Sequence, residues 1–251
     1  MTNISSANST AGPERPLTDQ VALITGGSRG IGKAIARKLA QLGAAVSLCG
    51  RNAQTLESAA SEIREFSKRV LAFPADVTNS KEISALVQAT EEKLGPISIL
   101  VNNAGIGNPG FGAIQEKSES EWVQVFDTNL KSVFLVSRTV APLMIERHRG
   151  DIINISSLAG KNTFAGGGIY CASKWGLQGL SGCMAEDLRA HGIRVSVVCP
   201  GSVATEFSGR GPKDATKVLT AADVAHAVAM LALQGPQSFI SEVQMRPVAK
   251  P

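Results

Sequence analysis

The chain has 251 residues, of which 43% are hydrophobic and 18% are charged. This is enough apolar material for one large α/β domain, and it excludes wholesale disorder. The net charge of +4 comes from 25 basic and 21 acidic residues scattered along the chain, so no nucleic-acid-binding surface is indicated. The apolar runs are far shorter than the roughly 20 residues of a membrane span, so no membrane partner is expected either.

Residues 1–16 are rich in Ser, Thr, Asn and Pro and lack the basic and apolar regions of a secretory signal. We expect a disordered tail over 1–16 and one domain over 17–251. No two cysteines form a CxxC pair, which predicts reduced thiols and a cytoplasmic protein. The four cysteines are Cys49, Cys171, Cys183 and Cys199.

Short apolar segments alternate with segments of helical periodicity. The predicted strands are 21–25, 45–49, 70–73, 97–101, 151–156, 194–199 and 239–245. The predicted helices are 31–42, 53–66, 80–94, 118–148, 170–190 and 221–234. This alternation predicts a doubly wound parallel sheet of seven strands with helices on both faces. Such sheets bind ligands beyond the carboxyl ends of their strands.

A glycine-rich turn, Gly26-Gly27-Ser28-Arg29-Gly30-Ile31-Gly32, joins the first predicted strand to the first helix. Glycines let backbone N–H groups approach a phosphate, and the helix N-terminus adds partial positive charge. The spacing is G-x-x-x-G-x-G rather than the usual G-x-G-x-x-G fingerprint. The context of the turn predicts a dinucleotide site, and a turn with packing duties alone is the alternative.

The end of the second predicted strand bears on which dinucleotide binds. Gly50 stands where NAD sites place an acidic ribose ligand, and no carboxylate occurs between Asp19 and Glu57. The same stretch contains Arg29 and Arg51, and guanidinium groups bind phosphate bidentately. The combination favours NADP(H), although either arginine alone would read as a solvated charge.

The only tyrosine, Tyr170, lies four residues before Lys174 in a predicted helix, so the two share one helical face. A phenol has a pKa near 10, and a neighbouring ammonium is expected to lower it toward the range useful for proton transfer. A core tyrosine beside a snorkelling lysine is the alternative.

A serine follows the fifth predicted strand, where its hydroxyl would hold a substrate carbonyl beside the phenol. Ser156 and Ser157 compete for this position. Adjacent side chains of a strand point to opposite faces, so at most one of them faces the cleft.

These motifs together resemble the short-chain dehydrogenase/reductase family, from about residue 19 to residue 234. Thr25–Gly32 resembles its glycine motif, and the spacing to Tyr170 favours Ser157 as the family's serine. Other matches, in order, are Asp76 after the third strand, Asn102-Asn103-Ala104-Gly105 at the end of the fourth, and Pro200-Gly201 after the sixth. Asn129, Ser157, Tyr170 and Lys174 fall in the family's catalytic order.

The resemblance implies reversible reduction of a ketone or aldehyde with NADP(H) and without metal. Tyr170 would exchange the proton, Lys174 would tune the phenol and hold the nicotinamide ribose, Ser157 would orient the carbonyl, and Asn129 would anchor a water relay. The expected cofactor contacts are Gly26, Ser28, Arg29, Gly30, Ile31, Gly32, Arg51, Asp76, Val77, Asn103, Ala104, Gly105, Tyr170, Lys174, Pro200, Gly201, Val203 and Thr205.

Substrate contacts are expected from the loops after strands four, five and six, and their apolar character predicts an apolar small molecule. The candidates beside Ser157 are Ile106, Phe111, Phe164, Ile169, Val203 and Phe207, each of which could instead anchor a loop. Glycines within 201–220 predict a mobile flap. The apolar stripes of 118–148 and 170–190, with the family resemblance, predict a homo-oligomer, a dimer or more readily a tetramer.

The C-terminal segment 239–247 lacks the V-D-G-G-like turn of acyl-carrier-protein-linked 3-oxoacyl reductases. A broad-specificity carbonyl reductase or alcohol dehydrogenase is therefore the first expectation, and a 3-oxoacyl reductase is the alternative. A non-catalytic NADP-sensing protein is a further alternative, against which the complete catalytic set argues.

Overall fold

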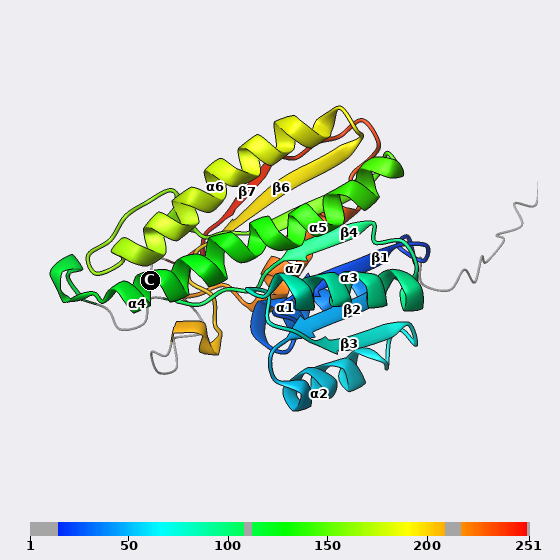
Figure 1. The fold of residues 1–251 in the computed structure, drawn as a ribbon, viewed down its shortest axis with the longest axis horizontal. Helices are drawn as coiled ribbons and strands as arrows, with labels where there is room; N and C mark the ends of the chain where they lie inside the picture. Colours follow the sequence, from blue (N-terminus) through cyan, green and yellow to red (C-terminus); the bar gives the residue numbers. More distant parts are fainter. Residues whose placement is uncertain (1–14, 108–111, 209–216, 250–251) are drawn as a thin grey trace, which may run out of the picture.

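The computed structural model describes residues 15–107, 112–208 and 217–249 (Figure 1). They form a seven-stranded parallel sheet, as the sequence predicts, and the structure gives the strand order β3-β2-β1-β4-β5-β6-β7. The strands are β1 (Val21–Thr25), β2 (Ala45–Gly50), β3 (Val70–Pro74), β4 (Ile99–Asn102), β5 (Gly150–Ile155), β6 (Ile193–Pro200) and β7 (Glu242–Met245). The direction of winding reverses between β1 and β4, which makes the adjoining strand ends the expected ligand site. Almost all of the predicted tail, 1–16, lies outside the described residues.

Two apolar clusters sandwich the sheet, one on each face. The first face is covered by α1 (Gly30–Gln41), α2 (Ala53–Ile63) and α7 (Ala221–Ala232). The second is covered by α3 (Ser80–Leu94), α5 (Ser132–Glu146) and α6 (Gly168–Arg189). β1, buried along its whole length, shows why the strand segments are continuously apolar rather than alternating.

The predicted helix 118–148 is divided into three parts. α4 (Glu119–Phe126) passes through a π-helical segment, η2 (Asp127–Lys131), into α5. A π-helical turn inserts a residue and rotates the side chains that follow it, and such turns are frequent at functional sites. η2 contains Asn129, which is fully buried rather than exposed on the helix surface.

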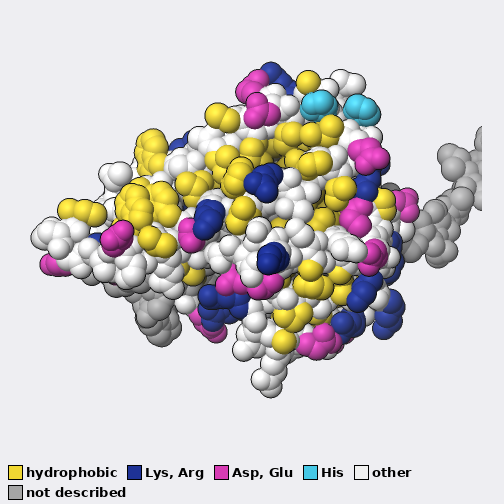
Figure 2. Space-filling view, viewed as in Figure 1, with side chains coloured by type: hydrophobic (Ala, Val, Ile, Leu, Met, Phe, Trp, Pro, Cys, Tyr) yellow, Lys and Arg dark blue, Asp and Glu magenta, His cyan; other side chains and the backbone are white. Residues whose placement is uncertain are grey.

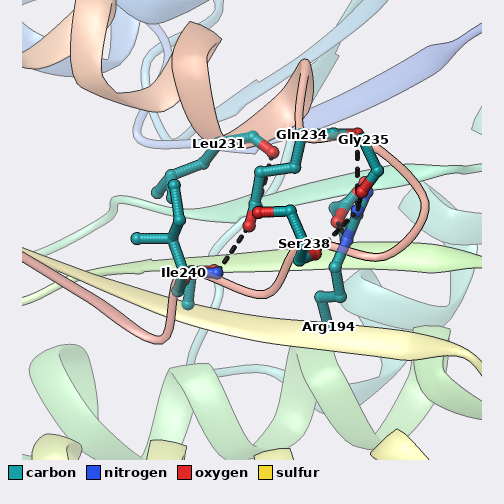
Figure 3. Close-up of polar contacts among 8 residues, drawn as sticks. Arg194, Leu231, Gln234, Gly235, Ser238 and Ile240 are labelled. Atoms are coloured by element: carbon teal, nitrogen blue, oxygen red, sulfur yellow. Dashed lines mark hydrogen bonds and ion pairs between the residues drawn. The ribbon is translucent and has the colours of Figure 1, made fainter.

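β7 begins at Glu242, so the predicted strand 239–245 is too long at its N-terminal end. Side chains take over backbone hydrogen bonds just before it: Gln234 Oε1 accepts from the Ile240 N–H (2.6 Å), and Ser196 Oγ donates to the Ile240 carbonyl (2.7 Å). Arg194 also donates to the carbonyls of Gly235 and Ser238 (Figure 3). The loop 233–241 is thereby fastened to β6 without continuing the strand ladder.

The four cysteines form no disulfide in the structure, and three of them are buried. The cytoplasmic location inferred from cysteine usage stays a prediction. Within the described ranges, every helix is too short or too polar to cross a bilayer.

Candidate active site

The glycine turn after β1 is shaped by close backbone approach. Gly26 has a φ of +66° and Gly30 a φ of +54°, both in the region that favours glycine. A Cβ on Gly32 would come within 2.2 Å of the Gly26 carbonyl oxygen and 2.5 Å of Asn103 Nδ2. Asn103 donates from Nδ2 to the carbonyls of Thr25 (2.9 Å) and Gly26 (3.1 Å), so the end of β4 pins the turn.

The N-terminus of α1 is equipped for an anion. Its N-cap residue, Arg29, makes no capping hydrogen bond with its side chain, and no acidic residue occupies the first turn. By contrast, α2, α3, α4 and α7 are all capped by a side chain. Uncapped N–H groups at a glycine turn are what a cofactor pyrophosphate requires, so the residues present fit a dinucleotide.

A groove runs from this turn across the ends of β2, β3 and β4. It is lined by Gly26, Cys49, Gly50, Arg51, Ala75, Asp76, Val77, Thr78, Ala104, Gly105, Ile106, Gln124, Asp127 and Thr128. Arg51 is exposed at this groove. Arg29 is engaged elsewhere, because its Nη1 lies 2.9 Å from Glu206 Oε2. Of the two arginines predicted to bind the 2′-phosphate, only Arg51 lines the groove.

Tyr170 lies in the first turn of α6, facing Ser157 at the end of β5. Burial raises the pKa of Tyr170 to about 12, and hydrogen bonding with Ser157 acts in the opposite direction. The expected lowering of the phenol pKa by Lys174 is wrong for this structure, because burial outweighs any effect of the ammonium. Lys174 Nζ lies 5.9 Å from the Tyr170 ring centroid.

Lys174 is 4% exposed, one turn after Tyr170. Its Nζ donates to the Ile155 carbonyl oxygen (3.0 Å) at the end of β5. Burial lowers the pKa of Lys174 to about 8. The ammonium is thus held at the end of the central sheet, where burial favours its neutral form more than water does.

The structure distinguishes the two serines. Ser156 is buried beneath α6, where its Oγ accepts from Gln178 Nε2 (2.9 Å). Ser157 is partly exposed on the opposite side of the chain; its Oγ accepts from the Ala159 N–H (3.1 Å). The two adjacent side chains therefore point to opposite sides of the chain just after β5, which leaves Ser157 as the serine beside Tyr170, as the spacing predicts.

Asn129 is positioned by the π-helical segment toward the loop after β4. Its Oδ1 accepts from the Ile106 N–H (2.8 Å), and its Nδ2 donates to the Ile106 carbonyl (3.0 Å) and to Ser173 Oγ (3.2 Å). Ser173 Oγ in turn donates to the Tyr170 carbonyl (2.8 Å). Asn129 thus links the β4 loop to the helix that carries Tyr170 and Lys174, and its water relay remains a prediction.

The loop after β6 completes the site. Val203 is 7% exposed, and Thr205 lies over Gly30, with its Cγ2 3.6 Å from a Cβ placed there. Phe207 is 44% exposed, and its ring centroid lies 6.1 Å from that of Tyr170. Residues 209–216 of the predicted flap, 201–220, lie outside the described residues.

Ile169 and Phe164, two further residues predicted to contact the substrate, differ in their exposure. Ile169 is 1% exposed and packs inside the protein, so its assignment to the substrate is withdrawn in favour of the alternative, a buried anchor. Phe164 is 47% exposed and keeps its place among the candidates. Phe111 lies outside the described residues.

Sequence reasoning missed Ser173, Gln178 and Glu206. Ser173 hydrogen-bonds to Asn129 and to the Tyr170 carbonyl, Gln178 hydrogen-bonds to Ser156 and Cys199, and Glu206 pairs with Arg29. None stands in a distinctive local pattern, although the positions of Ser173 and Gln178 on the helical face of Tyr170 and Lys174 are a usable signal. Among the residues that the structure describes, no three His, Cys, Asp or Glu side chains are grouped to hold a metal ion.

The chain is similar in sequence to known proteins. The short chain dehydrogenase family profile matches residues 20–215. The ketoacyl reductase HetN of Nostoc sp. is 40% identical over 187 residues, which cover 74% of this chain and 64% of that protein.

Two solved structures share the fold. A metagenomic short-chain oxidoreductase in complex with NADP is 43% identical, with a TM-score of 0.82, covering 94% of this chain and 100% of that chain. A variant actinorhodin polyketide ketoreductase with NADPH is 34% identical, with a TM-score of 0.83, covering 92% and 95%. With its parallel sheet, its glycine turn and the matched family profile, the chain belongs to the short-chain dehydrogenase family of oxidoreductases.

Proposed function

We propose that the protein is an NADP(H)-dependent carbonyl reductase that interconverts ketones or aldehydes and alcohols. The observation that carries this proposal is the cluster of Tyr170, Ser157 and Lys174 at the end of β5, beside the glycine turn. A bound nicotinamide would supply or accept the hydride. The residues of the chain bind the cofactor, hold the carbonyl and move the proton.

The charges around the groove favour NADP(H) over NAD(H). Arg51 lines the groove, and Gly50 leaves the adjacent position without a carboxylate. A 2′-phosphate there meets the Arg51 guanidinium, and position 50 carries no carboxylate that would repel it. The NADP and NADPH complexes of the two structural relatives support this choice. Asp76, Val77, Ala104 and Gly105 line the same groove and are proposed to contact the adenosine half.

Tyr170 is the proposed proton donor in the direction of reduction. Its raised pKa keeps the phenol protonated at neutral pH, as a general acid must be. Ser157 is proposed to hold the carbonyl oxygen next to this hydroxyl. Lys174, held by the Ile155 carbonyl, is proposed to bind the nicotinamide ribose and to stabilise the phenolate that remains after proton transfer.

A 3-oxoacyl thioester reductase is the second candidate. It is supported by similarity to a ketoacyl reductase and to a polyketide ketoreductase. Both candidates use the same residues and differ only in the group attached to the carbonyl carbon. Substrate assays therefore decide between them.

We also propose that the protein forms a homo-oligomer through α4, α5 and α6. Trp122 and Val123 on α4, Phe134 on α5 and Trp175 on α6 are each 44–49% exposed. Figure 2 shows apolar side chains gathered on the side of the molecule where these helices lie. Exposed aromatic groups at this density are typical of protein–protein interfaces.

The test is NADPH oxidation with a panel of ketones, 3-oxoacyl thioesters and sugars, followed by absorbance. Turnover by the native protein and loss of at least ~100-fold in Tyr170→Phe are expected, since general acid catalysis contributes about 10²–10⁴-fold. NADPH binding, measured by fluorescence titration, should persist in this variant because only a hydroxyl is removed. Retention of more than about a tenth of the activity would assign proton transfer to another group.

A further inference from the structure

Phe207 stands over the open side of the proposed proton donor. Its ring meets that of Tyr170 edge-on, with an interplanar angle of 61° and a centroid distance of 6.1 Å. A Cβ on Gly107 would lie 3.6 Å from Phe207 Cε1, so the glycine leaves room for the ring. Phe207 remains 44% exposed in this position. A large apolar surface is therefore held beside the reacting phenol and is still available to a ligand.

Two more apolar side chains lie at the start of α6. A Cβ on Gly167 would come within 2.5 Å of Phe164 Cε2, so the Phe164 ring rests directly on the backbone there. Ile114 Cδ1 would lie 3.7 Å from a Cβ on Gly168. Phe164 and Ile114 are 47% and 67% exposed. We call Phe207, Phe164 and Ile114 the apolar rim.

Two charged side chains in the adjoining loops form ion pairs. Lys161 Nζ bonds to Glu242 Oε2 (2.6 Å), and Glu206 Oε2 bonds to Arg29 Nη1 (2.9 Å). Neither Lys161 nor Glu206 is thus held ready for a charged substrate group. The apolar rim therefore offers a ligand apolar contact, and Phe207 and Phe164 offer contact with an aromatic ring.

We propose that Phe207 determines substrate specificity and that it selects ketones with a planar aromatic group on the carbonyl carbon. This inference rests on the carbonyl reductase function proposed above. A carbonyl oxygen held by Tyr170 and Ser157 places its aryl substituent within reach of Phe207, because the two rings of the protein are only 6.1 Å apart. An aryl ring gains an edge-to-face or offset contact there, and a puckered alkyl ring of equal size does not.

Acetophenone and cyclohexyl methyl ketone test the proposal, since both have eight carbons and only one is planar. The measured quantity is the ratio of their kcat/KM values with NADPH, in the native protein and in Phe207→Leu. Dividing one ratio by the other cancels the different intrinsic reactivities of the ketones. The aryl-to-alkyl ratio is expected to fall about threefold to tenfold in the variant, the effect of losing one aromatic contact.

Phe66→Leu is the matched control, because Phe66 lies in the α2–β3 loop, where its ring contacts Arg37. Thermal melting of each variant establishes that it is folded. An unchanged ratio in Phe207→Leu overturns the proposal, as does a fall of equal size in Phe66→Leu.

Ligand-observed NMR binding of the two ketones to the NADPH complex separates this inference from the proposed function. Suppose that NMR shows a preference for binding the aryl ketone, that Phe207→Leu loses this preference, and that the native protein turns over neither ketone. This result supports the inference about Phe207 and counts against the proposed function. If the native protein turns over both ketones and Phe207→Leu leaves the ratio of their kcat/KM values unchanged, the proposed function is supported and the inference about Phe207 is overturned.

Discussion

Arg29 Nη1 and Glu206 Oε2, 2.9 Å apart, join the glycine turn to the loop that follows β6. Thr205, the residue before Glu206, lies against Gly30 of the same turn. The guanidinium that the sequence assigns to the 2′-phosphate is thus already paired with a carboxylate. We propose that a cofactor 2′-phosphate and the Glu206 carboxylate compete for the Arg29 guanidinium.

Replacing Glu206 with Gln is expected to tighten NADPH binding. The competing charge is lost while the side-chain size is kept. Both partners are highly exposed, so the pair contributes at most about 1 kcal/mol and the gain in affinity is at most about fivefold. Fluorescence titration with NADPH and NADH measures it, and NADH affinity should not change.

The double variant Arg29→Gln, Glu206→Gln is the control. Once Arg29 is absent, the change at Glu206 should have no further effect on NADPH binding. Equal tightening of NADH and NADPH by Glu206→Gln would contradict competition and point to movement of the loop.

Gly50→Asp is expected to change the cofactor preference. A Cβ at Gly50 would lie 3.5 Å from Leu56 Cδ1 and 3.6 Å from Ser28 Oγ, so a larger side chain begins in ordinary contact. The new carboxylate would repel a 2′-phosphate and accept from a ribose 2′-hydroxyl. We expect kcat/KM for NADPH to fall at least ~10-fold, equivalent to about 1.4 kcal/mol, and that for NADH to rise.

Two variants accompany Gly50→Asp. Gly50→Ala adds the Cβ without the charge and should keep the preference for NADPH, whereas Arg51→Asp should erode or reverse it. The native protein is expected to prefer NADPH by at least about tenfold. Equal use of both cofactors by the native protein would refute the charge argument.

The free energy of unfolding should depend on pH through the ionisation of Lys174. Burial lowers the pKa of Lys174 to about 8, from an ordinary value of 10.5. Between these values the unfolded chain binds more protons, so this group makes the free energy of unfolding rise with pH. Below pH 8 Lys174 is protonated in both the folded and the unfolded chain, so the full cost of burying its charge lowers the free energy of unfolding.

Lys174→Met removes this dependence. The stability of the native protein relative to the variant should therefore increase by about 2 kcal/mol from pH 7 to pH 9.5. Urea unfolding at the two pH values measures the difference, with Lys93→Met in α3 as the control for loss of an exposed lysine. A difference independent of pH would mean that the ammonium is well solvated in the folded protein.

Phe134→Glu is expected to dissociate the proposed oligomer. Phe134 is 45% exposed on α5, so the substitution costs little within one protomer but buries a carboxylate in an interface. Light scattering at micromolar concentration should give a smaller mass for the variant than for the native protein. A monomeric native protein would refute assembly altogether.

The sequence by itself determined the features that depend on local physics. Continuous apolar runs and helical stripes identified seven strands and their helices, because burial on both faces of a sheet removes the polar alternation. The glycine turn was evident because a positive φ at Gly26 and Gly30 requires a residue without a side chain. The early start assigned to β7 failed because two side chains, Gln234 from the preceding loop and Ser196 from β6, satisfy the backbone of Ile240.

The tertiary structure alone decided how the candidate residues act on one another. It turned Ser157 toward Tyr170 and Ser156 under α6, and the π-helical segment buried Asn129 against Ile106. It also reversed the expected pKa shift of Tyr170, since the desolvation of a phenol depends on everything packed around it. Burial and long-range pairing are properties of the folded chain, and no local pattern of residues encodes their balance.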